Sequence, residues 1–138
     1  MKKKIVLAFS GGLDTSYCAL FLSKELDYEV HTLTVNTGGF DAQEIKSIEN
    51  RARSLSVSSH TTVNETDSYY TKVIRYLIFG NVLKNGTYPL SVSAERMSQA
   101  LAVARFAKET NAKAVAHGST GAGNDQVRFD MVIQILAP

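Results

Sequence analysis

The feature that most constrains the fold is the regular alternation of short apolar segments with helical patterns. Residues 5–9 form a continuous apolar run that ends at Ser10-Gly11-Gly12. Such a run is typical of a strand that is covered on both faces, as in a parallel sheet. Further strands are predicted over residues 29–36, 59–63 and 114–117. Helices are predicted over residues 14–26, 41–55, around 69–77, over 92–109 and from about residue 125, and no hairpin is predicted.

This order of elements predicts an α/β protein with a doubly wound parallel sheet and helices on both faces. The chain has 138 residues, which suits one domain, so we take residues 1–138 as a single unit. Ligands of such sheets bind beyond the carboxyl ends of the strands. Two glycine-rich loops, residues 10–16 and 118–125, are expected at such ends.

Two helices carry finer predictions. Asp41, followed three residues later by Glu44, forms a capping-box pattern that opens the helix over residues 41–55. The helix over residues 92–109 has an apolar stripe that we interpret as core; it consists of Met97, Ala100, Leu101, Ala104 and Ala107.

Composition excludes several classes of protein. Hydrophobic residues make up 44% and charged residues 20%, and the net charge is only +2, which is too balanced for a dedicated nucleic-acid binder. Cys18 is the single cysteine, so neither a disulfide framework nor a cysteine zinc cluster is expected, and a reducing compartment is indicated. The apolar run after Lys4 is too short for a signal peptide or a membrane span. We therefore expect a cytoplasmic protein without a membrane partner.

The first glycine-rich loop, residues 10–16, has the chemistry of a phosphate site. Adjacent glycines at positions 11 and 12 allow the backbone to approach a ligand closely. The helix that follows offers free N–H groups and a favourable dipole for an anion. Ser10, Thr15 and Ser16 add hydroxyl groups, and Asp14 could orient the loop or meet a metal-bound phosphate; an ordinary turn with Asp14 as a cap is the alternative.

Two commoner phosphate motifs are excluded. Gly118 and Gly123 have the glycine spacing of a P-loop, but Asn124-Asp125 stands where Lys-Ser/Thr is required. Gly121 and Gly123 begin a dinucleotide-binding pattern, but position 126 is Gln.

The segment Ser10-Gly11-Gly12-Leu13-Asp14-Thr15-Ser16 resembles the pyrophosphate loop of the N-type ATP pyrophosphatases. A longer second segment, from His117 to Phe129, resembles the substrate loop of the argininosuccinate synthase family, as do residues 8–16 and Tyr88-Pro89-Leu90 leading to Ser93. The three segments occur in the family's order. The resemblance covers essentially this whole chain, but only the N-terminal part of a family member.

The resemblance implies a fold of the adenine nucleotide alpha hydrolase type and a ligase of arginine biosynthesis. Its reaction converts ATP, citrulline and aspartate into argininosuccinate, AMP and pyrophosphate. The citrulline ureido oxygen attacks the α-phosphorus, pyrophosphate leaves, and the aspartate amine then displaces AMP. The residues implied for ATP are Ala8, Phe9, Ser10, Gly11, Gly12, Leu13, Asp14, Thr15, Ser16, Val35 and Gly118.

The amino-acid sites are implied in the same way. Tyr88, Ser93, Asn124 and Arg128 would bind citrulline, and Thr120, Asn124 and Asp125 would bind aspartate. Asp14, Asn124 and Asp125 would serve the chemical steps. The residue types suit these roles. The guanidinium group of Arg128 can bind a carboxylate through two parallel hydrogen bonds, and the side-chain amide of Asn124 can both donate and accept.

Positioning and electrostatic stabilisation of the leaving pyrophosphate can carry this reaction without a general base. Mg²⁺ is expected only as a companion of ATP, with no protein metal site. Phe9, Val35 and Ala122 depart from the residues usual in the family, namely Tyr, Ala and Lys.

Because family members are much longer, we expect this chain to be an N-terminal fragment that is truncated before a fifth strand. We expect it to lack synthase activity alone, and the full-length enzyme to be a homotetramer. Two alternatives remain. One is another ATP-pyrophosphatase-type enzyme, such as a tRNA-modifying one, although the low net charge argues against a nucleic-acid partner. The other is a non-catalytic nucleotide-binding module.

Overall fold

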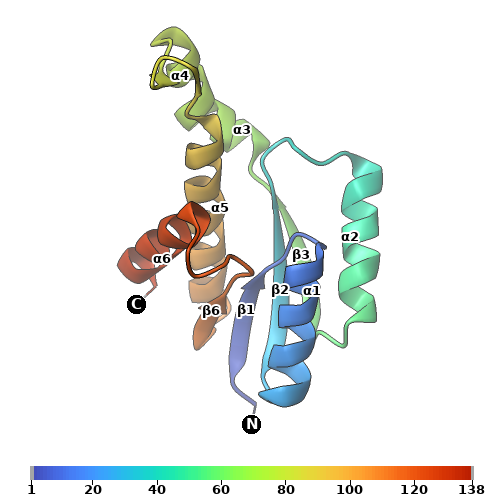
Figure 1. Ribbon diagram of the computed structural model, residues 1–138. Coiled ribbons are helices and arrows are strands. Elements are labelled where there is room, and N and C mark those ends of the chain that lie inside the picture. The colour runs from blue at the N-terminus through green and yellow to red at the C-terminus, as the bar shows by residue number, and fades with distance from the viewer. Residues whose placement is uncertain (1, 138) are drawn as a thin grey trace.

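A four-stranded parallel sheet lies at the centre of the computed structural model, which describes residues 2–137 (Figure 1). Its strands are β1 (Lys4–Ala8), β2 (Glu29–Asn36), β3 (Ser59–Asn64) and β6 (Ala114–Ala116). The order across the sheet is β3-β2-β1-β6, and all neighbouring strands run parallel. The chain therefore winds outward from β1 to β3 and then returns to the other side of β1. This is the predicted doubly wound α/β fold.

Helices cover both faces of the sheet (Figure 1). One face carries α1 (Leu13–Leu20), its continuation η1 (Phe21–Glu25), and α2 (Ala42–Ser54). The other face carries α5 (Ser91–Glu109), which packs against α6 (Asn124–Leu136). No helix that the structure describes between residues 2 and 137 is long and apolar enough to cross a bilayer.

The core follows the alternation of side chains along β1. Ile5 and Leu7 point into a cluster with Ala19 of α1 and with Ile48 of α2. Val6, between them, belongs to the opposite cluster, which contains residues of α5 and Phe129 of α6. Successive residues of a strand point to opposite faces, so an all-apolar strand of this kind needs cover on both sides. The two clusters supply that cover.

Several predicted elements are confirmed, and two details differ. Asp41 caps α2 through its own side chain, which accepts from the N–H groups of Gln43 and Glu44, while the Glu44 carboxylate accepts from the N–H of Asp41. Met97 is 45% exposed, so its prediction as core is wrong. The helix turns it toward solvent, and Ala100, Val103 and Ala107 belong to the core cluster that includes the sheet residues.

An arm between β3 and α5 extends beyond the sheet (Figure 1). It contains α3 (Thr66–Tyr69), η2 (Tyr70–Ile74), α4 (Arg75–Phe79), β4 (Leu83–Lys84) and β5 (Tyr88–Pro89). The two short strands pair antiparallel, so the prediction of no hairpin is wrong. Asn85 and Gly86 both have positive φ, 53° and 67°, as a type I′ turn requires. The Asn85-Gly86 pair is the local sequence signal for this hairpin.

Candidate functional site

A cavity of about 320 Å³ opens at the carboxyl edge of the sheet, beside β1 and next to the point where the strand order reverses. Ligands of doubly wound sheets bind at this position. Three segments supply most of its lining. The first covers residues 8–15, except Gly11, at the end of β1 and in the loop after it; the second is residues 33–35 of β2, together with Phe40; the third is residues 117–119, directly after β6. The remaining wall comes from α5 and α6, namely Arg96, Gln99, Val103, Asp125 and Phe129.

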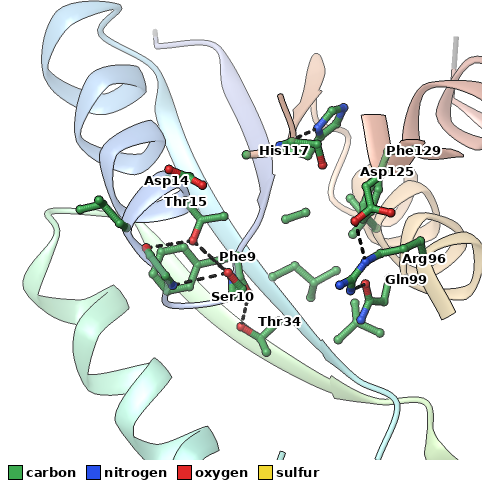
Figure 2. Close-up of a pocket in the computed structure, with 18 of the residues that line it drawn as sticks. Phe9, Ser10, Asp14, Thr15, Thr34, Arg96, Gln99, His117, Asp125 and Phe129 are labelled. Carbon is green, nitrogen blue, oxygen red and sulfur yellow. Dashed lines mark hydrogen bonds and ion pairs between the residues drawn. The ribbon is translucent and has the colours of Figure 1, made fainter. Parts of the chain in front are cut away.

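The first loop is held in shape by its own hydroxyl groups (Figure 2). The Oγ1 of Thr15 accepts from the N–H of Ser10 at 3.4 Å and donates to the carbonyl of Gly12 at 3.3 Å. The Ser10 hydroxyl lies 3.3 Å from the same Oγ1. On the neighbouring strand, Thr34 donates to the carbonyl of Phe9 at 2.7 Å. The loop is therefore anchored to β2 and closed on itself.

The start of α1 is suited to an anion. Gly12 is the N-cap residue, and because it has no side chain it leaves the first N–H groups of the helix uncapped. The hydroxyl of Ser16 is buried and has no hydrogen-bond partner among the residues that the structure describes. Gly11 has a φ of +75°, and a Cβ there would approach Cγ1 of Ile48 to 3.0 Å. Only glycine fits this turn without strain.

The second loop presses against the first. A Cβ built at Gly118 would lie 2.9 Å from Cγ2 of Thr15 and 3.3 Å from its backbone nitrogen. Segments that are about a hundred residues apart in the chain thus meet backbone to side chain at the cavity. In the same second loop, a Cβ at Gly121 would meet nothing within 4 Å.

The opposite wall carries a charged network (Figure 2). The Nε of Arg96 donates to Oδ2 of Asp125 at 3.1 Å, and its Nη1 donates to Oε1 of Gln99 at 2.8 Å. Arg128 donates from Nη1 to the other oxygen of Asp125 at 2.8 Å. The carboxylate of Asp125 therefore joins two guanidinium groups, and the three side chains together carry one net positive charge beside the cavity.

The structure brings most predicted nucleotide residues to one cavity. Its lining includes Ala8, Phe9, Ser10, Gly12, Leu13, Asp14, Thr15, Val35, Gly118 and, from the amino-acid set, Asp125. The other predicted residues lie outside the lining; they are Gly11, Ser16, Tyr88, Ser93, Thr120, Asn124 and Arg128. Arg128 is linked to the cavity through Asp125, whereas Tyr88 stands on β5 in the arm and is 49% exposed.

Sequence reasoning missed Arg96 and Gln99 as residues of the site. They lie on α5 three residues apart, and Val103 follows four residues later on the same helical face. Polar residues that interrupt the core-facing side of a helix near the carboxyl edge of a sheet were the available signal.

Two further observations concern the reactive and metal-binding side chains of the chain. Burial, with a smaller contribution from the carboxylate of Asp14, raises the pKa of the Cys18 thiol, which keeps it protonated and unreactive at neutral pH. Among residues 2–137, no group of three His, Cys, Asp or Glu side chains is arranged to hold a metal ion.

Comparison with known families and sequences gives a consistent result. The family model described as "Arginosuccinate synthase N-terminal HUP domain" matches residues 4–138. The argininosuccinate synthase of Xylella fastidiosa is 48% identical over 142 residues, an alignment that covers 99% of this chain and 35% of the relative. That of Saccharolobus solfataricus is 44% identical, over 98% of this chain and 34% of the relative. The chain thus spans about a third of the length of the curated relatives that it matches.

A solved structure shows the same fold at lower similarity. It is described as a predicted subunit of tRNA methyltransferase from Methanocaldococcus jannaschii, and it aligns with a TM-score of 0.58 and 19% identity. The alignment covers 88% of this chain and 55% of that one.

Proposed function

Because this chain belongs to the argininosuccinate synthase family, as the N-terminal HUP domain of its members, we propose that it forms the ATP-binding domain of a ligase that joins citrulline to aspartate. The products would be argininosuccinate, AMP and pyrophosphate. The observation that carries the proposal is the meeting of two glycine-containing loops at one cavity, with Gly118 packed on Thr15. The single cysteine of the chain is compatible with a cytoplasmic location.

We assign the phosphates of ATP to the first loop and to the start of α1. The uncapped N–H groups after Gly12 would donate to phosphate oxygens. The buried hydroxyl of Ser16, which lacks a partner in the described chain, supports this assignment, since such groups are rarely left unsatisfied. Val35 of β2 would contact the adenosine, and Gly118 would lie against the nucleotide.

The carboxylate of Asp14 lies in the first turn of α1 and lines the cavity. It would repel a bare triphosphate. Mg²⁺ bound to ATP would neutralise part of the phosphate charge, so that the phosphates could lie close to the Asp14 carboxylate. In the proposed reaction Asp14 therefore serves orientation and charge balance rather than proton transfer.

We assign the amino-acid substrates to the opposite wall. Asp125 lines the cavity and would accept from the ammonium group of aspartate, together with Thr120 and Asn124. Arg128, which is held by Asp125 at 2.8 Å, would face the carboxylate of citrulline, and Tyr88 and Ser93 would complete that site. The chain's contribution to rate is to align the reactants and to stabilise developing charge on the leaving pyrophosphate.

Two measurements test the proposal. MgATP is titrated into the 138-residue chain and binding is followed by calorimetry, with GTP as the control nucleotide. Saturable binding that prefers ATP is expected, and no detectable binding would contradict the assignment of the cavity.

Pyrophosphate release then tests the reaction. We would join this chain to the remaining two thirds of the Xylella fastidiosa relative and omit citrulline or aspartate in turn. Release that requires citrulline, and argininosuccinate formation that requires both amino acids, are expected of the chimera but not of the 138-residue chain alone. ATP binding without any response of the folded chimera to either amino acid would instead favour a nucleotide-binding module.

A further inference from the structure

The imidazole of His117 is fixed at the mouth of the second loop by three neighbours. Its Nδ1 accepts the backbone N–H of Ser119 at 3.3 Å, and its Nε2 lies 3.0 Å from Oδ1 of Asp130. The ring of Phe129 lies against it, with the two ring centroids 5.2 Å apart. The His117 side chain is only 14% exposed, so these contacts, rather than water, determine the orientation of its ring.

The contacts determine where the ring carries its proton. A backbone N–H can only donate, so Nδ1 must be the unprotonated acceptor. A carboxylate can only accept, so Nε2 must carry the hydrogen that points at Asp130. Of the two neutral tautomers, this arrangement therefore selects the Nε2–H form, because a ring that carried its hydrogen on Nδ1 would direct it at the Ser119 amide.

Asp130 is itself anchored by the helix that carries it. Its second oxygen accepts from the side-chain amide of Gln126, one turn earlier on α6. The hydrogen bond from His117, followed by that from Gln126, lowers the pKa of the Asp130 carboxyl below its usual value. Asp130 is absent from the cavity lining, so its influence on a ligand would pass through His117.

The position of His117 determines the position of its neighbours. Gly118 follows it directly and packs on Thr15 of the first loop, and the Ser119 amide is held by the imidazole. Both residues line the cavity together with His117. A contact that fixes this ring to α6 therefore fixes the spacing between the two loops at the cavity.

We propose that Asp130 is a positioning residue of the ATP site, which acts by holding His117 as its Nε2–H tautomer and thereby keeping Gly118 and Ser119 in place beside the first loop. The ATP part of this inference rests on the proposed function, whereas the tautomer part does not. Carboxylates orient histidines in the same way around metal sites, by accepting a hydrogen bond from the ring. Here the oriented histidine would hold a loop in place.

The test uses Asp130→Asn in the 138-residue chain, with Asp130→Glu as the conservative variant and Asp67→Asn as a control on the distant helix α3. An asparagine at this position loses the negative charge, and it accepts from His117 only if its NH₂ group faces Gln126, whose side-chain amide must then rotate to present its oxygen. The protonation of the His117 ring nitrogens is read by long-range ¹H–¹⁵N NMR, and MgATP affinity is read by calorimetry.

We expect the wild-type chain to show the Nε2–H form and Asp130→Asn to shift the population away from it. The same variant should bind MgATP about tenfold more weakly, equivalent to about 1.4 kcal/mol, whereas Asp130→Glu should recover most of the affinity and Asp67→Asn should resemble wild type. A purely structural role would alter thermal stability without changing the tautomer, so circular dichroism melts accompany each variant.

Three results would overturn the proposal. They are a wild-type His117 protonated at Nδ1, an Asp130→Asn variant with unchanged tautomer and affinity, or equal loss of affinity in the Asp67→Asn control. If wild type shows the expected tautomer but binds no ATP, the proposed function fails and so does the role of Asp130 at an ATP site, while the link between Asp130 and the His117 tautomer stands.

Discussion

The cavity at the sheet edge and the arm between β3 and α5 differ in how completely this chain forms them. The first loop closes on its own hydroxyl groups, and the second loop packs against it. In the arm, Phe79 is 82% exposed, Ile78 62% and Tyr76 56%. Apart from Leu13, which is 84% exposed, the apolar side chains that line the cavity are buried or half-buried, whereas many of those in the arm are exposed.

This difference divides the proposed site into two halves. The residues assigned to ATP come mainly from the carboxyl ends of β1, β2 and β6, and all of them except Gly11 and Ser16 line one cavity. Tyr88, which is assigned to citrulline, comes from the loosely packed arm, and Ser93 lies in the first turn of α5 immediately after it. We therefore expect nucleotide binding to be a property of this chain, and citrulline binding to need contacts beyond those that the chain makes.

The largest contrast should appear in stability. Leu7 is fully buried in the cluster beneath α1 and α2. Leu7→Ala should lower the free energy of unfolding by about 2–5 kcal/mol, because the cavity left behind cannot close completely. Phe79→Ala, in the arm, should change it by no more than about 0.5 kcal/mol. Urea unfolding followed by circular dichroism measures both.

Similar losses in the two variants would break the comparison, since they would mean that Phe79 is covered. A covered Phe79 would point to self-association through the arm. Sedimentation velocity of wild type and of Phe79→Ala across a range of concentrations distinguishes self-association from packing of Phe79 within a monomer.

A second contrast lies within the second loop and concerns binding. Gly118→Ala places a Cβ 2.9 Å from Thr15, whereas Gly121→Ala has open space around it. The first variant should displace one loop from the other and weaken MgATP binding by about tenfold or more, about 1.4 kcal/mol or above. The second should bind as wild type does. Calorimetric titration of both variants checks this, and equal affinities would show that the contact between the loops does not shape the nucleotide site.

Much of the framework could be predicted from the sequence, because its signals are local. The apolar run before Ser10 indicated a strand buried on both faces, and the Asp41–Glu44 pair marked the start of a helix; the structure contains both. The assignment of residues 10–16 to ATP also rests on adjacent residues, through the family resemblance, and it stays a prediction.

The details that escaped prediction depend on packing between distant segments. Nothing near Arg96 in the chain shows that it will meet Asp125, which comes from another helix. The exposure of Met97 depends on the rotation of α5 against the sheet, which helical spacing alone leaves open by one residue. The pair of His117 and Asp130 likewise joins a strand end to a helix thirteen residues later. The missed hairpin is different, since Asn85-Gly86 was a readable local signal.

The smallest expected effect is a pH dependence of the free energy of unfolding, which we attribute to a histidine of the sheet and not to the arm. His60 lies on β3, where Nδ1 is 2.9 Å from the hydroxyl of Thr32 and Nε2 is 3.2 Å from that of Thr62. Burial lowers the pKa of His60; the Glu49 carboxylate opposes this shift and Arg53 adds to it. The folded chain therefore resists protonation of this ring more than the unfolded chain does.

The sign of the effect follows from proton linkage. Between the lowered folded pKa and the unfolded value of about 6.5, the unfolded chain binds more protons, so stability falls as pH drops through that range. Urea unfolding at about pH 7.5 and about pH 5.5 should show this loss in wild type and a smaller loss in His60→Gln. The carboxyl of Asp130, whose pKa is lowered, loses its contribution only near or below the ordinary aspartate value of about 3.9, so it does not interfere. If His60→Gln kept the full pH dependence, the titrating group would have to be sought outside β3, and the contrast between sheet and arm would lose this support.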